Sequence, residues 1–463
     1  MTVWVNDVHS RLNRTAMNGQ AAPHSVDELR SVFANAVSSQ TPVSLAGGRH
    51  AMGGQQFTAG GMLVDTSRLD AVLDLDRQRG LVKTQAGIQW PGLLQALATL
   101  QKGETRPWSI RQKQTGADTF SLGGSVAANI HGRGLAMRPF IDDIEELDLL
   151  LTDGQLVVVN RNDEPQLFSL VAGGYGLFGA VTAVTLRLSR RSLLERVVEL
   201  RRSDELHDLF ASRKREGFLY GDFQFSCDET SDDYLNTGIF SCYRLAEQET
   251  APGEQKSLRA VDWSRLVQLA HTAKGDAFRE YAGYYLSTSG QLYWSDTHQM
   301  SVYLEDYHEA LDTRLAATTA ATEMIGELCV PRNELSAFLA ETREDFRRND
   351  VNVIYGTIRV IEADRESFLP WARQDYASVI FNLHTEHTPE GVRTTRDAFV
   401  RSIDRAIDFG GSYYLTYHRW ARPDQVERCY PRIREFLTLK RQYDPAELIR
   451  TDWYQAMRQT FGE

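Results

Sequence analysis

Three glycine-rich stretches hold the residues of this chain that could do chemistry. In the first, residues 43–56, a short β-type segment runs into a glycine pair, then His50, then a second glycine pair. Backbone without side chains lets successive N–H groups turn into one concavity, which suits a phosphate or pyrophosphate. A second strand-like segment follows, where a Rossmann fingerprint requires a helix. The pattern predicts a phosphate cradle between strands, with a histidine at its tip.

The second stretch, residues 115–134, offers a run of small side chains. Gly123 and Gly124 stand shortly before Ala127 and Ala128. A flat ring system could press closely against such backbone. The same residues also suit a small-residue helix packed on a sheet, and both interpretations stay open.

The third stretch contains a literal GxGxxG at Gly174, Gly176 and Gly179. Residues 180–188 then alternate with period two and are rich in β-branched side chains, which predicts a strand. A nicotinamide-binding fold needs a helix at this point. We therefore interpret this motif as a false match to a nicotinamide site.

Residues 384–387 read His-Thr-Glu-His, a spacing that can bind zinc when it lies on a helix. Here it follows an apolar, strand-like segment and precedes Pro389. We therefore expect no metal. The alternative is that one of these histidines lines a pocket and acts as a base with a pKa near the working pH.

The elements that position these stretches indicate an α+β architecture. Ser25 and Glu28 form a capping-box pattern ahead of a helix. Strand-like segments follow at residues 43–45, 62–69 and 81–88, a helix at 90–100, and a hairpin at 144–159 that turns at Asp153-Gly154. Such alternation around glycine loops argues against a helical bundle.

Beyond residue 189 the composition changes, with more charged and aromatic residues and no glycine loops. Strands are expected at residues 218–225, 237–243, 351–361 and 378–383, and a helix at 334–347. After a glycine pair at 410–411 the chain continues into amphipathic helical segments at 427–443 and 446–458. This indicates a second domain of sheet and helices and a C-terminal return.

Length and composition restrict the class of protein. A chain of 463 residues predicts more than one domain. Its net charge of −11 argues against a nucleic-acid partner. Four scattered cysteines suit buried thiols in a reducing compartment, and no apolar run is long enough to span a bilayer. The N-terminus lacks the pattern of a signal peptide. We expect a cytoplasmic protein.

Together, residues 41–188 resemble the vanillyl-alcohol-oxidase family of FAD oxidoreductases, with its PCMH-type FAD-binding domain. Residues 323–332 and 443–452 make the chain most similar to the decaprenylphosphoryl-ribose oxidase and alditol oxidase branches. The resemblance implies a split FAD-binding domain of two subdomains, residues 1–196 and 411–463, with a mixed sheet-plus-helix substrate domain, residues 197–410, inserted between them.

The resemblance also implies which residues bind FAD. The cradle would hold the pyrophosphate, and the second stretch would line the ribityl chain and the ring edge. The full set is Ala46, Gly47, Gly48, Arg49, His50, Ala51, Met52, Gly53, Gly116, Ser121, Leu122, Gly123, Gly124, Ala128, Asn129, Ile130, His131, Val181 and Tyr414. In many relatives a histidine in the first loop is bonded to the 8α-methyl group of the flavin. We expect the same of His50, with a non-covalent loop histidine as the alternative.

For catalysis, Arg359 matches a substrate-site arginine of the alditol oxidases, but Thr357 stands where they carry a glutamate. Tyr417, followed by His418, stands where they carry an active-site lysine. These departures argue against a sugar or polyol substrate. We expect Tyr417, Arg359, His384 and His418 to be the catalytic groups. The alternatives are a packed aromatic for Tyr417 and a salt-bridged strand residue for Arg359.

The resulting hypothesis is an FAD-dependent oxidoreductase that transfers a hydride from a CH–OH carbon of a small polar substrate to flavin N5. The reduced flavin would be reoxidised by oxygen or by another acceptor. Oxidation of a CH–NH carbon or an oxidative tailoring step is an alternative on the same fold. A flavin-binding protein without catalysis is an alternative of another class.

Overall fold

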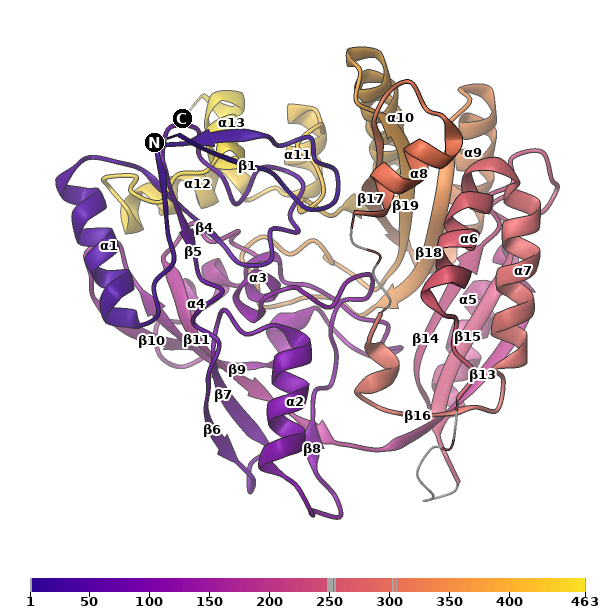
Figure 1. Cartoon of the computed structure of the whole chain (residues 1–463), viewed down its shortest axis with the longest axis horizontal. Coiled ribbons are helices and arrows are strands. Elements are labelled where there is room, and N and C mark those ends of the chain that lie inside the picture. Colours follow the sequence, from indigo (N-terminus) through magenta and orange to yellow (C-terminus); the bar gives the residue numbers. More distant parts are fainter. Residues whose placement is uncertain (1, 248–252, 254, 302–303, 305, 463) are drawn as a thin grey trace.

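A computed structural model describes residues 2–247, 253, 255–301, 304 and 306–462. Figure 1 shows two parts side by side. One contains the N-terminal residues together with the C-terminal helices, so that the two ends of the chain lie next to each other. The other is built on a large sheet from the middle of the chain. The arrangement is α+β, as expected.

The first part contains a small parallel sheet ordered β3-β5-β4 (Gly19–Ala21, Met62–Asp65 and Val43–Ala46). Helix α1 (Val26–Ser38) begins where the sequence predicts, because the Ser25 side chain accepts a hydrogen bond from the Glu28 N–H. Strands β1 (Val3–Val5) and β2 (Thr15–Met17) form a separate antiparallel pair.

Five further strands form an antiparallel sheet in the same part, and short helices pack around it. The order is β10-β9-β11-β7-β6 (Leu156–Asn160, Ile144–Leu150, Ala180–Arg187, Leu81–Gln85 and Val72–Asp76). Strands β9 and β10 are the expected hairpin. The helices are α2 (Trp90–Leu100), α3 (Leu122–Ala128) and α4 (Pro165–Val171). A two-stranded sheet pairs β8 (Trp108–Ser109) with β12 (Ser189–Arg190).

The described strands of the second part form an eight-stranded antiparallel sheet. Its order is β16-β13-β15-β14-β18-β19-β17-β20 (Leu292–Trp294, Leu193–Arg202, Thr237–Leu245, Phe218–Phe225, Val353–Ile361, Tyr376–Glu386, Ala321–Pro331 and Ser412–Tyr413). All four strands expected from the sequence are present. β13 and β20 extend this sheet beyond the predicted substrate segment at either end.

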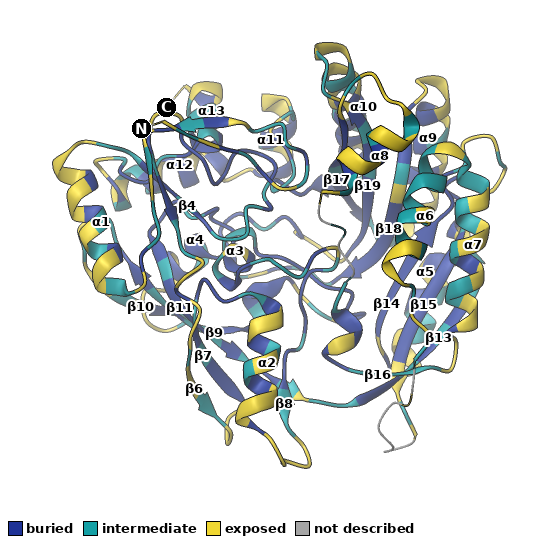
Figure 2. Ribbon diagram, in the orientation of Figure 1, coloured by how far each residue is buried: buried dark blue, intermediate teal, exposed yellow. Residues whose placement is uncertain are grey.

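Helices cover the two faces of this sheet differently. Helices α5 (Leu206–Arg215), α9 (Leu335–Arg348) and α10 (Pro389–Asp408) pack on one face. On the other, helix α7 (Lys274–Ser287) packs on β13 and β15, and α6 (Ala260–Thr272) packs against β18. Helix α8 (Tyr307–Leu315) lies beside β17. Figure 2 shows mostly buried strands beneath helices whose outer sides are exposed. The rest of the second face is turned toward the first part of the molecule.

The C-terminal helices lie against the first part of the molecule. The N–H of Val43 donates to the carbonyl of Leu448, and the N–H of Asp452 donates to that of Phe57. The single helical segment predicted at residues 427–443 is wrong: α11 (Pro423–Cys429) ends before Pro431, and α12 (Ile433–Tyr443) begins after it.

The last predicted helix also begins later than expected, since α13 spans Asp452–Phe461. The Asp444 carboxylate instead accepts hydrogen bonds from the N–H groups of Leu448 and Ile449, which holds that segment in a turn. Among the described helices, no segment combines the length and the apolar character that a bilayer span requires.

Candidate functional site

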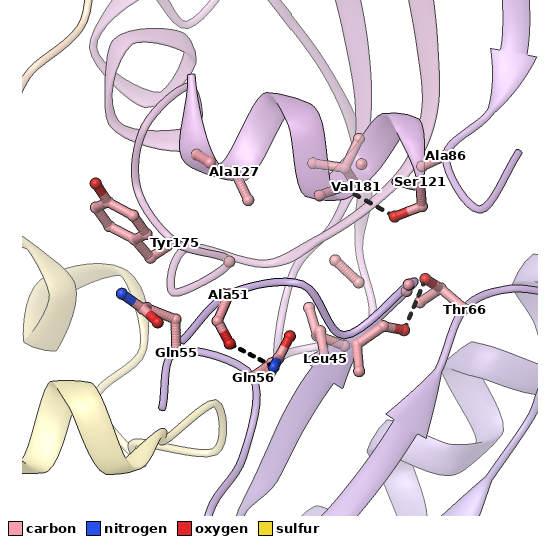
Figure 3. A pocket seen from close by; sticks show the side chains of 18 of the residues that line it. Leu45, Ala51, Gln55, Gln56, Thr66, Ala86, Ser121, Ala127, Tyr175 and Val181 are labelled. Carbon is pink, nitrogen blue, oxygen red and sulfur yellow. Dashed lines mark hydrogen bonds between the residues drawn. The ribbon is translucent and has the colours of Figure 1, made fainter. Parts of the chain in front are cut away.

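The three glycine-rich stretches converge on one cavity in the first part of the molecule (Figure 3). Strand β4 leads into its floor and helix α3 forms the opposite wall. The lining residues are Leu45, Ala46, Gly47, Gly48, Arg49, His50, Ala51, Gln55, Gln56, Thr66, Ala86, Phe120, Ser121, Gly123, Gly124, Ala127, Ala128, Val171, Tyr175, Gly176, Leu177, Phe178, Gly179, Ala180, Val181 and Thr416. Most of them are small or present backbone, so the cavity suits a large, flat ligand.

The first loop is packed so tightly that only glycine fits at its start. A Cβ atom on Gly47 would stand 2.1 Å from Oγ of Ser121, and one on Gly48 would stand 2.2 Å from the Thr119 carbonyl oxygen. Arg49 then adopts a left-handed φ of 57°, which is strained for a residue with a side chain. These constraints bring the backbone of the first loop against the second stretch, as a nucleotide cradle requires.

The second stretch combines the two interpretations left open by the sequence. Residues 122–128 do form a small-residue helix, and Ser121 caps it by accepting a hydrogen bond from the Gly124 N–H at 3.2 Å. The same helix lines the cavity with Gly123, Gly124, Ala127 and Ala128.

The third stretch lines the cavity too, and this was not foreseen residue by residue. As predicted, a strand follows it, β11, so it is not a nicotinamide motif. Gly176 and Gly179 have φ angles of 73° and 138°, and they turn the chain so that residues 175–181 form a wall. Of this segment, only Val181 was expected to contact the cofactor.

His50 lies at the edge of the cavity, with both ring nitrogens in contact. Its Nδ1 is 2.9 Å from Nε2 of His9, and its Nε2 is 3.0 Å from Oγ1 of Thr119. The ring stacks on Phe120 with 3.9 Å between centroids. Burial, reinforced by His9, lowers the pKa of His50 to about 3. The imidazole is therefore neutral at pH 7.

Several residues expected to bind the cofactor do not line the cavity. Met52, Leu122 and Ile130 are buried in the hydrophobic core. The N–H of Gly53 donates to the side chain of Gln55, and that of Gly116 donates to Ser301. Sequence motifs place a loop correctly but leave open which of its residues face inward.

Asn129, His131 and Tyr414 lie just beyond the cavity and connect the two parts of the molecule. The Asn129 amide donates to Asp364, at 2.9 Å. The Tyr414 hydroxyl donates to the Ala128 carbonyl. Nε2 of His131 lies 2.6 Å from Oε1 of Glu327 on β17. These residues position the sheet domain over the cavity.

Glu327 is the centre of a buried polar cluster at this junction. The Ser378 hydroxyl also donates to its Oε1, while Oε2 is buried and has no hydrogen-bond partner among the described residues. Burial alone would raise the pKa of Glu327. His131, Ser378 and Arg359 outweigh burial and hold this pKa below its ordinary value. The carboxylate is therefore ionised and has one oxygen available to a ligand.

The face of the eight-stranded sheet that carries Glu327, which we name the site face, is unusually polar. Antiparallel register places Gln224, Thr357 and Arg359 on the same side as Glu327. Within the part of the chain that the structure describes, each of these three has a buried polar atom without a hydrogen-bond partner: Gln224 Oε1, Thr357 Oγ1 and Arg359 Nε. Unpaired buried polar groups are costly, so their gathering on one face indicates a site for a polar ligand.

The four predicted catalytic residues lie in three different places. Arg359 and Tyr417 both interact with Glu327, and burial, reinforced by that carboxylate, raises the pKa of Tyr417 well above its ordinary value. His418 instead stacks on Trp420 and contacts Phe399 in a tilted arrangement, away from the site face. Ile380 pairs with Glu327, and His384 lies four residues beyond Ile380 on the same strand. His384 is therefore on the site face too, but about 13 Å along the strand from Glu327.

Two buried charged residues, Glu327 and Lys113, were not among the predicted site residues. Lys113 is buried, with its Nζ 2.7 Å from Asp118, and burial lowers its pKa to about 8. Glu327 could have been suspected as a charged residue among apolar ones at 324–330. The sequence around Lys113 contains no comparable pattern.

The comparisons with known proteins agree with this geometry. Residues 18–160 match the FAD binding domain family. The chain is 30% identical to cytokinin dehydrogenase 6 of Oryza sativa subsp. japonica over 247 residues. This aligned region is 49% of this chain and 44% of that protein. Over 162 residues the chain is 28% identical to the mitochondrial L-galactono-1,4-lactone dehydrogenase of Brassica oleracea, covering 34% and 26%.

A third relative is an uncharacterized oxidoreductase of the fasciation locus of Rhodococcoides fascians, 26% identical over 168 residues, or 36% of each chain. The aligned region spans less than half the length of each of these three relatives. The fold, the cavity and the family match together define a flavoprotein: residues 18–160 are a PCMH-type FAD-binding domain, as found in FAD-linked oxidoreductases.

FAD fits the cavity for a structural reason as well. The walls are formed by three backbone-rich loops, and added Cβ atoms at Gly47 and Gly48 would collide with the second stretch. Residues 46–51 line the cavity and would hold the pyrophosphate, and the small side chains of α3 would lie against the flat part of the cofactor.

Proposed function

We propose that this protein is an FAD-dependent oxidoreductase that oxidises a CH–OH carbon of a small polar substrate. One observation carries the proposal: the buried Glu327 carboxylate has an unpaired oxygen on a polar sheet face, next to the cavity. Ala128 and Thr416 line the cavity, while His131 and Tyr417, close by in the chain, interact with Glu327. The cofactor cavity and the polar site therefore adjoin.

When bound, FAD supplies the acceptor for the hydride that leaves the substrate carbon. The chain must remove the hydroxyl proton, and Oε2 of Glu327 is the acceptor that we assign to it. His131 and Ser378, on the other carboxylate oxygen, hold the group in place. Arg359 and Tyr417 orient the substrate oxygen and stabilise negative charge as it develops there.

At the first loop we propose covalent attachment of FAD through His50. The observations that support it are the neutral ring and its position at the cavity edge, fixed by His9, Thr119 and Phe120. An unlinked histidine against the cofactor is the alternative.

Three further assignments are also proposals. They are the division into residues 1–196, 197–410 and 411–463, reoxidation by oxygen or another acceptor, and a cytoplasmic location. Four buried free cysteines suit that location.

Oxidation of a CH–NH carbon is the second candidate. A buried carboxylate also pairs with an ammonium group, so Glu327 could bind an amine substrate. Relatives named as cytokinin dehydrogenase and as galactonolactone dehydrogenase act on different donors, which leaves both classes open for this chain.

The test is a screen for substrate-dependent reduction of the bound flavin. The purified protein is mixed without oxygen with polyols, hydroxy acids, lactones and amines, and the absorption band of oxidised flavin is followed. Bleaching by a hydroxylated compound is expected. Bleaching by amines alone would favour the second candidate, and a band that no donor bleaches would favour a flavin-binding protein without catalysis.

A further inference from the structure

A second cluster of chemically active side chains lies on the site face, beyond the Glu327 site. It consists of His271 from α6, Glu323 from β17 and His384 from β19. One ligand atom from each of the three lies within 4.8 Å of the other two. The three come from distant parts of the sequence, so only the packing of α6 on the sheet brings them together.

The backbone contact of His271 directs its Nε2 toward the Glu323 carboxylate. Its Nδ1 is 2.8 Å from the carbonyl oxygen of Val267, and only a protonated nitrogen makes such a contact. In the neutral ring Nε2 therefore carries a lone pair, yet it faces Oε1 of Glu323 at 2.9 Å. Two lone pairs at this distance repel each other unless a proton or a cation lies between them. Donation from Nδ1 to a backbone carbonyl is also how metal-binding histidines are usually oriented.

The other two residues are arranged to complete a cation site. Oε2 of Glu323 is occupied by the Tyr307 hydroxyl and by Nδ1 of His308, at 3.2 Å, which turns Oε1 toward the cluster. Nδ1 of His384 is buried, and none of the residues that the structure describes forms a hydrogen bond with it.

We propose that His271, Glu323 and His384 bind a divalent transition-metal ion such as Zn²⁺. Two imidazoles and one carboxylate are a common protein ligand set for this ion. Ligand atoms around a tetrahedral zinc ion stand about 3.3 Å apart, so small side-chain rotations close the cluster on it. Glu323 also lines a neighbouring cavity of about 210 Å³, together with Tyr307 and Asn382. A water molecule or an oxygen of a bound compound is the ligand expected at the fourth position.

This site differs from the one that the sequence suggested and that we expected to be absent. His387 cannot complete it, because its Nε2 contacts Oγ1 of Thr322, which points to the opposite face of the sheet from Glu323. The His-x-x-His spacing at 384–387 therefore does not form a ligand pair. His384 contributes to a different triad.

The experiment measures zinc retention by the full-length flavoprotein. Protein stripped with a chelator is dialysed against micromolar Zn²⁺ with excess Mg²⁺, and bound zinc is measured by elemental analysis. One zinc per chain is expected. His271→Ala, His384→Ala and Glu323→Gln should each lose stoichiometric binding, and His308→Ala should weaken it by about tenfold.

His387→Ala is the matched control, because it removes a nearby imidazole on the other face of the sheet and should retain zinc like the parent. Flavin content and circular dichroism establish that each variant is folded. The measurement uses no substrate, so it stands apart from the proposed oxidoreductase activity. Failure of the parent to retain zinc would overturn the proposal. Equal retention by all three ligand variants would do so too, since it would reveal an adventitious ion only.

Discussion

Nε2 of His9 lies 2.9 Å from Nδ1 of His50, so two histidines far apart in sequence meet at the edge of the flavin cavity. Burial lowers the pKa of His9 to about 4. The nearby Asp7 opposes this shift, and His308 adds to it. Both rings are therefore neutral at pH 7, and one proton is shared across the contact. His9 is thus placed to remove the proton from His50 as that ring forms a bond.

Replacement of His50 by Ala should abolish covalent attachment of the flavin. After acid precipitation of the parent, flavin fluorescence should remain with the protein in a denaturing gel, whereas the His50→Ala flavin should appear in the supernatant. His9→Gln should lower the linked fraction. His387→Ala, outside the cavity, should behave like the parent. Complete release of flavin from the parent would contradict the linkage.

Glu327→Gln should slow flavin reduction by substrate by about 10²- to 10⁴-fold, because the amide cannot accept the substrate proton. Flavin content should stay unchanged, since Glu327 does not line the cofactor cavity. Glu386→Gln alters an exposed carboxylate at the end of β19 and is the matched control. A full reduction rate in Glu327→Gln would show that another group takes the proton.

Local patterns in the sequence predicted most of the elements. Ser25 and Glu28 start α1, and Asp153-Gly154 turns the hairpin, because such signals depend on neighbouring residues alone. The break at Pro431 is a local signal too, but the amphipathic pattern on either side concealed it.

The catalytic end of the site could not be predicted in the same way. Glu327 meets His131 only because β17 and the segment after α3, nearly 200 residues apart, pack against each other. The sequence around His384 and His418 does not distinguish their positions. Strand register directs His384 to the site face, whereas aromatic packing buries His418 elsewhere. Long-range pairing, which no local spacing encodes, decides these positions.

Gly47→Ala should reduce flavin retention. The added Cβ would stand 2.1 Å from Oγ of Ser121, so the first loop must move away from α3, at a cost of about 1–3 kcal/mol. Flavin-to-protein ratio after gel filtration measures the effect. Gly92→Ala, in α2, is the control, because its Cβ meets only Ile88 at an ordinary 3.6 Å. Equal flavin ratios in both variants would argue against the tight cradle.

His418→Phe should make the protein less sensitive to acid. Burial lowers the pKa of His418 to about 3 from 6.5. Below pH 6.5 the unfolded chain therefore takes up a proton that the folded chain does not, and stability falls as pH falls. Between pH 7 and pH 5 this histidine should cost about 2 kcal/mol of unfolding free energy, a loss that the variant avoids. Urea unfolding at both pH values measures it, and an identical loss in parent and variant would refute the assignment.

The most direct test of the account is the FAD content of the purified protein after incubation with excess FAD and removal of unbound cofactor. The converging glycine loops predict about one FAD per chain, with the absorption spectrum of a protein-bound flavin. A colourless protein that takes up no FAD would contradict the cavity assignment and the proposed activity together.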